Sequence, residues 1–366
     1  MHDEKDGPGA AGHRRATLAA ALSCPALILL GVNYHYVSER AEGGRAIFPV
    51  TTEELTAQLE QLGRTLEFVS RDQLLAAVEH GAALPGAACL VTFDDGLRSQ
   101  FALALPVLER LGVPAIFFIS GRPHAERRAL HVHRVHALRE RLTEAEFGSL
   151  LERRLAAFGT NVPAVGDAEA QGMYRYDTPA AARVKYLLNV ALEREASERV
   201  VEAMFADAGP GERAFCDDLY MSDEQVRELE ARHGATGAHG YDHHPFATLD
   251  PVLKGADMAR GSDALRAITG AAPRIISYPY GSAAAVDRPV AEAAARLGYR
   301  VGLTMERAVN RSLAEPLLLA RLDTNDVPGG SRPRLRFGDE GEPVAEPGVT
   351  IARRRYFDET AVTVGA

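Results

Sequence analysis

Two adjacent carboxylates follow directly after an apolar run. The segment VTFDDG, residues 91–96, places Asp94 and Asp95 between a stretch typical of a buried strand and a glycine. Because Asp and Gly are also what a strand-to-helix turn requires, a turn with a helix cap is the simplest interpretation. The alternative is that one carboxylate binds a metal ion while its neighbour moves a proton. This alternative requires further ligands elsewhere in the chain.

Candidate ligands occur in the segment GAHGYDHHPF, residues 237–246. His239 and His243 stand four residues apart, a spacing at which two imidazoles reach one metal ion if the segment turns helically. His244 competes with His243 for this role. Such a pair of histidines is more often structural when it stands alone. Combined with Asp95, however, it forms a recognised set of metal ligands that leaves positions open for water and substrate.

Strand-like and helical segments alternate along most of the chain, which predicts parallel β/α units closing into a barrel. In barrels of this kind the active site lies at the carboxyl ends of the strands, where Asp94, His239 and Tyr280 all fall. The alternation stops after Ser120 for about a hundred residues of charged helical sequence. This stretch, about 121–220, is predicted to be a helical insertion.

We therefore predict three parts for the chain. Residues 1–27 form an N-terminal extension, residues 28–327 form the barrel with its insertion, and residues 328–366 form a tail. The tail is rich in Pro, Gly and charge, which favours loose packing. The apolar stretch near the N-terminus has a weak resemblance to a secretory signal, but it continues into the predicted first strand.

Composition limits the classes of partner. The 366 residues carry a formal net charge of −9 and an isoelectric point of about 5.8, which argues against nucleic acid or an anionic membrane. A small-molecule or carbohydrate substrate fits better, and no apolar stretch predicts a stable membrane span. The widely spaced Cys24, Cys89 and Cys216 indicate neither a disulfide framework nor a cysteine metal site. We expect a cytoplasmic protein; the oligomeric state is not predicted.

Three motifs in order, VTFDDG, HGYDH and SYPYG, resemble those of the polysaccharide deacetylase family. These NodB-homology carbohydrate esterases remove N- or O-acetyl groups from sugars with the help of a divalent metal. The resemblance covers residues 28 to 325, interrupted by the insertion. It implies an α/β fold, namely a distorted (β/α) barrel of the NodB-homology type.

The resemblance also implies roles for individual residues. Asp94 matches the catalytic base, and Asp95, His239 and His243 match the three metal ligands. Tyr280, which follows Pro279 in SYPYG, matches the residue whose backbone amide lines the oxyanion hole. In a permuted branch of the family the catalytic histidine follows the first strand in a Tyr-His pair. The segment NYHYV offers His35 in that place, as the general acid.

One position departs from the family pattern. Many relatives carry an arginine where this chain has Ser277, and that arginine orients the catalytic base. Arg321 or Arg274 could supply the charge from another strand; the alternative is that they are surface arginines, an interpretation that is equally good for Arg321 and better for Arg274. We place Arg321 and Asp323, in LARLDTND, near the barrel mouth with the oxyanion and substrate groups. Asp323 alternatively forms a turn.

The predicted function is metal-dependent hydrolysis of an N-acetyl group on an amino sugar, or on a glycan or metabolite that contains one. The single divalent ion is expected to be zinc, with cobalt, nickel or manganese as alternatives. A deformylase or another small-amide hydrolase is the closest competitor. A non-haem iron oxygenase is disfavoured because no acid stands within two residues of the first histidine. An inactive sugar-binding relative is disfavoured because the site residues are intact.

The insertion carries a further cluster of histidines in HVHRVHAL, namely His131, His133 and His136. We interpret it mainly as a solvated face of the insertion, with a second metal site as the less favoured alternative. The length of the insertion suggests a lid over the cleft. Such a lid suits a small or capped substrate better than a long polymer.

Overall fold

The structure is a computed structural model that describes residues 27–41, 44–338 and 342–346. Among these residues, eight strands form one parallel sheet with the order β10-β1-β5-β6-β7-β8-β9, and β4 pairs with β5 outside that path. The strands are β1 (Ile28–Tyr34), β4 (Glu67–Phe68), β5 (Ala87–Phe93), β6 (Ala115–Ile119), β7 (Thr236–Ala238), β8 (Ile275–Ser277), β9 (Val301–Leu303) and β10 (Leu322–Asp323).

The sheet curls until its two edges meet. The chain just before β10 returns to β9, because the amide of Thr304 donates to the carbonyl of Leu319 at 2.8 Å and that of Leu319 donates to Gly302 at 2.9 Å. Since β10 also pairs with β1, the circuit is nearly complete. The predicted distorted barrel of β/α units is confirmed.

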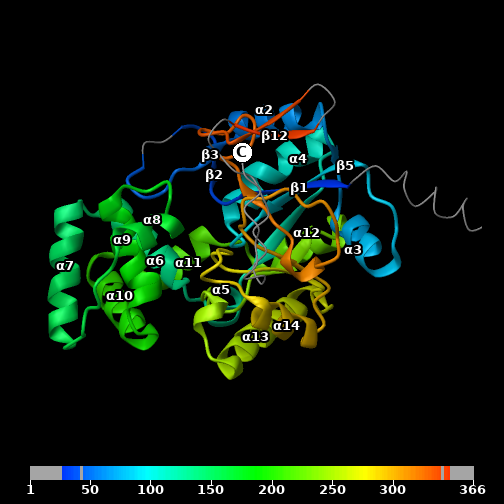
Figure 1. Cartoon of the computed structure of the whole chain (residues 1–366). Helices are drawn as coiled ribbons and strands as arrows, with labels where there is room; N and C mark the ends of the chain where they lie inside the picture. Colours follow the sequence, from blue (N-terminus) through cyan, green and yellow to red (C-terminus); the bar gives the residue numbers. More distant parts are fainter. Residues whose placement is uncertain (1–26, 42–43, 339–341, 347–366) are drawn as a thin grey trace, which may run out of the picture.

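Helices cover the outside of the barrel (Figure 1). They are α2 (Thr52–Gly63), α3 (Arg71–His80), α4 (Leu105–Leu111) with the preceding π-helical turn η1 (Gln100–Ala104), α12 (Asp223–His233), α13 (Pro251–Thr269) and α14 (Arg288–Arg296). Their boundaries follow local sequence signals. The α2 helix, for example, begins with a capping box in which Thr51 and Glu54 satisfy each other's backbone amides.

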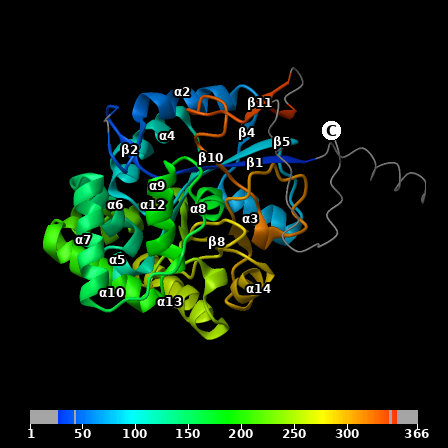
Figure 2. The same ribbon diagram turned by 60° about the vertical axis from the view of Figure 1, so that its left-hand side comes forward.

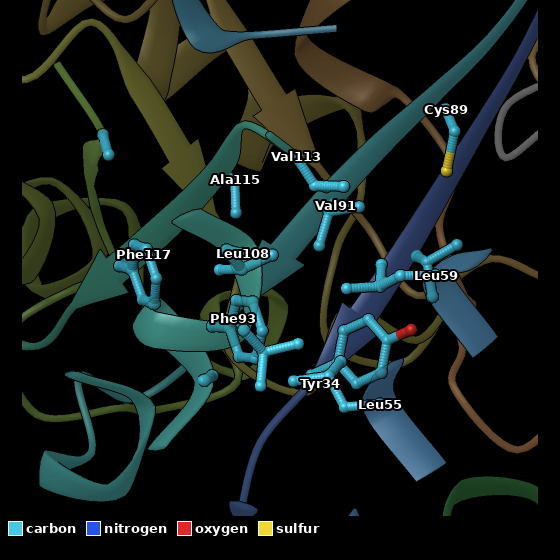
Figure 3. Packing of buried hydrophobic residues seen from close by; sticks show 14 of the residues in the cluster. Tyr34, Leu55, Leu59, Cys89, Val91, Phe93, Leu108, Val113, Ala115 and Phe117 are labelled. Atoms are coloured by element: carbon cyan, nitrogen blue, oxygen red, sulfur yellow. The ribbon is translucent and has the colours of Figure 1, made fainter. Parts of the chain in front are cut away.

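One face of the strands packs against the covering helices. Tyr34 and Phe93, the last residues of β1 and β5, stand side by side with Phe117 in the middle of β6, with ring centroids 5.1 and 5.0 Å apart. Figure 3 shows this row of rings together with Leu55 and Leu59 of α2. The first two rings of this row directly precede His35 and Asp94 in the chain, and their packing fixes the strand ends from which these two residues extend.

The opposite face of the strands points into the barrel, because successive side chains on a strand alternate. Leu29, Leu90, Ile116 and Leu303 meet there, although β5 and β9 are not neighbours in the sheet. Toward the carboxyl ends the inward positions become polar, and they include Asn33, Thr92 and Ser277, all buried. A polar layer therefore lies above an apolar barrel core.

The connection between β6 and β7 is a lobe of helices, which lies to one side of the barrel in Figures 1 and 2. It contains α5 (Gly121–Glu126), α6 (His131–Arg141), α7 (Glu144–Ala157), α8 (Asp167–Met173), α9 (Pro179–Tyr186), the π-helical turn η2 (Leu187–Ala191), α10 (Arg194–Ala208) and α11 (Glu212–Leu219). The lobe has its own apolar core, in which Val135, Leu151 and Val200 are buried. It also reaches the barrel mouth, where Arg307 donates to the Tyr176 hydroxyl at 3.3 Å.

Short elements complete the fold. They are the parallel pair β2 (Val37–Ser38) and β3 (Val50–Thr51), the antiparallel pair β11 (Leu335–Phe337) and β12 (Pro343–Ala345), and the 3-10 turns η3 (Phe246–Thr248) and η4 (Pro316–Leu318). The β11–β12 pair differs from the predicted loose tail, because Leu335 is buried in the main core. The segment with signal-like character at residues 1–26 lies outside the described residues. In the described part of the chain, no helix has the length and apolar character of a membrane span.

Candidate active site

The carboxyl ends of four barrel strands bring the predicted residues together. His35 follows β1, Asp94 follows β5, His239 follows β7, and Tyr280 stands three residues after β8. Because the strands are parallel, these ends open on the same side of the barrel. The residues are far apart in sequence, and only the barrel makes them neighbours.

Asp95, His239 and His243 form one buried cluster. Oδ1 of Asp95 lies 3.4 Å from Nε2 of His239 and 3.3 Å from Nε2 of His243, and the three candidate ligand atoms all lie within 4.8 Å of one another. Nδ1 of His239 is 2.8 Å from the carbonyl oxygen of Ser277, so it carries the proton and leaves Nε2 free to bind a cation.

The chemistry of this cluster fits a divalent cation. Oδ1 of Asp95 is buried and accepts no hydrogen bond from any described residue. Burial alone would raise the pKa of Asp95, but the adjacent His133, His239 and His243 hold the pKa well below its ordinary value. An ionised carboxylate oxygen without a donor, faced by two imidazole nitrogens, is a set of ligands that zinc accepts.

Asp94 lies in a different environment from its neighbour. Its carboxylate accepts one hydrogen bond per oxygen from Arg321, both at 2.9 Å, and Oδ2 also accepts one from Asn33 at 2.9 Å. Burial would raise the pKa of Asp94, but the charges of Arg321, His239 and His35 lower it to about 2. Asp94 is therefore ionised at every pH at which the protein would normally work.

Arg321 provides the arginine that the sequence lacks at position 277. Its side chain is completely buried, and besides Asp94 it donates to Ser277 Oγ at 2.7 Å and Thr92 Oγ1 at 2.9 Å. Because the guanidinium is enclosed in this way, it holds the Asp94 carboxylate rather than a substrate group. Arg274, the alternative from the sequence, is half exposed and pairs with Glu79 at the surface.

His35 is partly exposed at the end of β1, close enough to Asp94 to contribute to its low pKa. The buried amide of Gln100 joins the two strand ends, since it donates to the carbonyl oxygens of His35 at 2.9 Å and Asp94 at 2.6 Å. Gln100 opens the π-helical turn η1, and such turns are frequent at functional sites. Gln100 and Asn33 were not among the residues predicted from the sequence, where their only signal is polarity within otherwise apolar segments.

Backbone strain concentrates at this site. Among the described residues, four that are not glycine have a positive φ angle, and three of them lie here: Asp95 at 79°, His243 at 59° and Tyr280 at 61°. Side chains in this left-handed region cost roughly 1–2 kcal/mol each. Such strain persists only where the surroundings hold it, and it is typical of sites at which side-chain direction matters.

The loop between His239 and His243 is held by a side chain of α13. The buried carboxylate of Asp257 accepts hydrogen bonds from the amides of Tyr241 at 2.7 Å and Asp242 at 3.0 Å. Gly240 within this loop has a φ of 69°, and a Cβ there would lie 2.8 Å from the Asp257 carboxylate. The loop therefore requires both the glycine and the acid.

The remaining predicted residues lie around the site. Pro279 is buried, and the ring of Tyr280 contacts that of His243 edge-on at 5.0 Å between centroids. The role of the Tyr280 amide at the oxyanion stays a prediction. Asp323 accepts hydrogen bonds from the Asn325 amide at 2.9 Å and the Asn325 side chain at 2.7 Å, which are the bonds of a turn. Its contact with substrate likewise stays a prediction.

The interpretation of the insertion histidines as a solvated face is wrong. All three lie on α6, and His131 and His133 are buried. Nε2 of His133 lies 3.2 Å from Oδ2 of Asp95, so the insertion reaches the metal-ligand cluster directly. The hydroxyl of Tyr36 lies 3.1 Å from Nδ1 of His136. The polar face of α6 thus faces a polar site rather than water.

A cavity of about 430 Å³ lies beside the cluster, between the insertion and the barrel loops. His243 and Tyr280 border it on the barrel side, and His131 and Glu198 border it on the insertion side. His244 also lines this cavity, whereas Nε2 of His243 faces Asp95. Burial lowers the pKa of His244 to about 3, so this side chain is neutral.

Similar folds occur in solved deacetylase structures. A de-N-acetylase from Aggregatibacter actinomycetemcomitans matches with a TM-score of 0.50 and 16% identity over 81% of this chain and 94% of that one. The deacetylase PplD from Streptococcus pyogenes, solved with acetate, matches at 0.49 and 15% over 81% and 92%. IcaB from Ammonifex degensii matches at 0.48 and 20% over 81% and 91%. At these identities the likeness concerns the fold alone.

Sequence comparison adds the family. No curated protein matches the sequence significantly. The family model for polysaccharide deacetylase, in contrast, matches residues 82–146 and 196–302. The matched ranges contain Asp94, Asp95, His239 and His243, and the gap between them falls within the helical insertion. The chain therefore belongs to the polysaccharide deacetylase family, and it is a hydrolase of that family.

Proposed function

We propose that the protein is a metal-dependent hydrolase that removes the N-acetyl group from an amino sugar. The observation that carries this proposal is the unbonded Oδ1 of Asp95, buried and faced by the Nε2 atoms of His239 and His243. A second ionised carboxylate, Asp94, lies beside it. Two carboxylates in different surroundings are suited to different tasks, here binding a cation and accepting a proton.

A divalent ion held by Asp95, His239 and His243, with zinc as the expected metal, would polarise the acyl carbonyl and lower the pKa of a water molecule toward about 7. Asp94 then accepts the proton of the attacking water. Because Arg321 and the other charges lower the pKa of Asp94 to about 2, this carboxylate is a weak base. It therefore requires an acidified water, and its own surroundings support the need for a metal.

Two further groups complete the reaction. The backbone amide of Tyr280 donates to the oxygen on which negative charge develops. His35 donates a proton to the departing amine, and its partly exposed position at the end of β1 gives it access to substrate. Since Asp94 must be ionised and His35 must be protonated, the two groups have opposite requirements.

The cavity supports a compact substrate. Its volume of about 430 Å³ lies within the range of roughly 300–1,000 Å³ that small-molecule sites occupy. Glu198 and His131 line it, and Oε1 of Glu198 lies 3.5 Å from Nη1 of Arg122 and 3.9 Å from Nδ1 of His131. Both accept hydrogen bonds, because the other nitrogen of His131 is 3.1 Å from the Leu188 carbonyl and so carries the proton. Such a lining suits the hydroxyl donors of a sugar ring.

The test is release of acetate from a panel of N-acetylated amino sugars, free, nucleotide-linked and within short glycans. We expect release that is abolished by a chelator and restored by zinc or cobalt. The Asp95→Ala variant should release no acetate and bind no metal. Release by a metal-free protein at the wild-type rate would contradict the proposal.

The same panel distinguishes the competing activity. N-formyl analogues of the same sugars test the deformylase alternative, since the site would cleave any accessible amide. We expect the acetyl compounds to be the better substrates by kcat/KM. The predicted cytoplasmic location stays a prediction.

A further inference from the structure

The Asp95 carboxylate has two oxygens with different partners. Oδ1 faces the two histidine ligands and accepts no hydrogen bond, as described above. Oδ2 lies 3.2 Å from Nε2 of His133, which comes from helix α6 of the insertion and is only 1% exposed. Among the described residues, the insertion therefore supplies the hydrogen-bond donor to Oδ2, the oxygen that does not face the histidine pair.

The hydrogen bonds around His133 fix its proton. An ionised carboxylate can only accept, so Nε2 of His133 must carry the proton that it donates to Asp95. Nδ1 of His133 lies 2.6 Å from the hydroxyl of Tyr220, and that hydroxyl accepts the amide proton of Leu130 at 3.0 Å. The Tyr220 hydroxyl proton is thus free to point at Nδ1. A neutral His133 satisfies every bond in this chain.

The other end of the insertion is bonded to the same loop. Tyr220 forms an isolated antiparallel bridge with Leu97, and the amide of Met221 donates to the carbonyl of Gly96 at 3.0 Å. The loop that follows Asp95 is therefore held by backbone bonds from the end of the insertion and by a side chain from α6. These contacts surround the residue whose φ of 79° requires support.

We propose that His133 is a positioning residue of the metal centre, which holds Asp95 through Oδ2 so that Oδ1 faces the ion, and that the insertion thereby completes the centre. This inference rests on the proposed metal site. Hydrogen-bonding partners of metal ligands orient those ligands, and their loss typically lowers metal affinity about 10- to 100-fold. The insertion then has a role beyond covering the substrate cavity.

A direct ligand role for His133 is the alternative that the experiment must separate. The cluster of ligand atoms within 4.8 Å of one another contains Asp95, His239 and His243. His133 lies beyond it, on the other oxygen of the carboxylate. A glutamine can replace the Nε2–H donor of a histidine, but it is a poor replacement for an imidazole ligand.

The test is titration of the metal-free full-length protein with Co²⁺ and Zn²⁺, monitored by calorimetry and by the visible spectrum of bound cobalt. His133→Phe should bind Co²⁺ about 10- to 100-fold more weakly than the wild type. His133→Gln should retain most of the affinity and the wild-type cobalt spectrum. His131→Phe is the matched control, because His131 is buried on the same helix but bonds to Leu188 and not to Asp95; its metal affinity should equal that of the wild type.

Each outcome has one meaning. Equal affinity of His133→Phe and wild type would overturn the positioning role while leaving the proposed metal site intact. Loss of affinity in both His133→Phe and His133→Gln would overturn it in favour of a ligand role. A wild-type protein that binds neither metal would contradict the proposed function itself.

Hydrogen exchange gives a second readout that does not depend on activity. Because His133 connects α6 to Asp95, zinc should slow amide exchange in α6 and around residues 220–221 of the wild type. We expect this protection to be lost in His133→Phe and kept in His133→Gln. Unchanged exchange in the zinc-bound wild type would contradict the coupling between metal and insertion.

Discussion

Arg321 and Asp94 form a two-pronged ion pair inside the barrel, although they are 227 residues apart in sequence. Both side chains are nearly inaccessible to solvent, at 0% and 4% exposure. The arginine also donates to Ser277 Oγ, and the carbonyl of Ser277 accepts the proton of His239. Ser277 thus connects the arginine that holds the proposed base, Asp94, to one of the proposed metal ligands, His239.

This arrangement explains how the site tolerates a serine at position 277. In the family pattern an arginine at this position orients the base, and here the guanidinium arrives from the segment just before β10 instead. The small side chain of Ser277 leaves room for it and provides an acceptor. The departure from the family motif is therefore a relocation of the charge rather than its loss.

Breaking this pair should destabilise the protein strongly. Arg321→Met leaves the Asp94 charge buried without its partner, which is expected to lower the free energy of unfolding by about 3–5 kcal/mol at pH 7. The difference in free energy of unfolding between variant and wild type should shrink as the pH falls toward 2. Asp94 becomes protonated there, so the wild type loses the stabilisation that its ionised carboxylate gains from Arg321. Urea unfolding at several pH values measures both effects.

The control is Arg274→Met, because Arg274 is half exposed and pairs with Glu79 at the surface. Its free energy of unfolding should stay within about 0.5 kcal/mol of the wild type. Equal stability of Arg321→Met and the wild type at pH 7 would show that the buried pair contributes nothing.

The two adjacent aspartates should separate proton transfer from metal binding. Asp94→Asn should keep the metal and lower turnover by about 10²- to 10⁴-fold, because the residue accepts the proton of the water. It should also lose stability, since Arg321 remains buried without a carboxylate. Asp95→Asn should lose metal. Metal content, turnover and melting temperature decide this; equal and mild losses in both variants would favour a simple turn.

The neighbouring histidines should differ sharply in metal content. His243→Ala removes an Nε2 atom that lies 3.3 Å from Asp95, so it should lose bound zinc. His244→Ala alters the cavity wall instead and should retain zinc. Metal analysis after gel filtration checks this, and full zinc retention in His243→Ala would reverse the assignment of the two residues.

The substrate side can be tested at Glu198. Glu198 lines the cavity, so Glu198→Gln should raise KM for the amino sugar, by about 10-fold for a lost hydrogen bond to a charged group. Both kcat and metal affinity should stay near their wild-type values. Glu202→Gln, one turn further along the same helix and with an exposed side chain that pairs with Arg128, is the control and should leave KM unchanged. An unchanged KM in Glu198→Gln would contradict the binding of substrate in this cavity.

The sequence was sufficient to predict the parts of the site that follow strand ends. Asp94, Asp95, His239 and His35 each stand directly after an apolar strand or in the turn that follows one, and parallel strands bring such positions to one edge. The barrel could be predicted for the same reason. Arg321 could be named only as one of two alternatives, because its pairing depends on how the barrel closes.

Other features could not be predicted because their signals are ambiguous. A polar helix face usually meets water, and that rule misplaced His133, whose helix turns its polar face toward the metal-ligand cluster. Asn33 and Gln100 are single polar residues among apolar ones, and nothing in the sequence tells which buried group they serve. The strand at 335–337 is short, and a Pro- and Gly-rich context concealed it.

A final prediction concerns Asp257, which holds the loop between the proposed metal ligands His239 and His243. Burial raises the pKa of Asp257 to about 6, although its two backbone hydrogen bonds oppose the rise. The folded pKa thus lies above the unfolded value, so the folded state binds the proton more tightly. The tighter binding of this proton stabilises the folded state fully below about pH 4, and this stabilisation is lost as the pH rises to about 6.

Asp257→Asn does not titrate, so the stability of wild type minus variant should fall between pH 4 and pH 6. The fall should be at most about 3 kcal/mol, because each tenfold change in proton affinity is worth about 1.4 kcal/mol. Urea unfolding of both metal-free proteins at pH 4, 5, 6 and 7 measures this difference. Asp263→Asn, exposed on the same helix, should show no such slope. If the free energies of unfolding of the wild type and Asp257→Asn changed in parallel with pH, the Asp257 carboxyl would have an ordinary pKa. Its burial would then not disfavour ionisation.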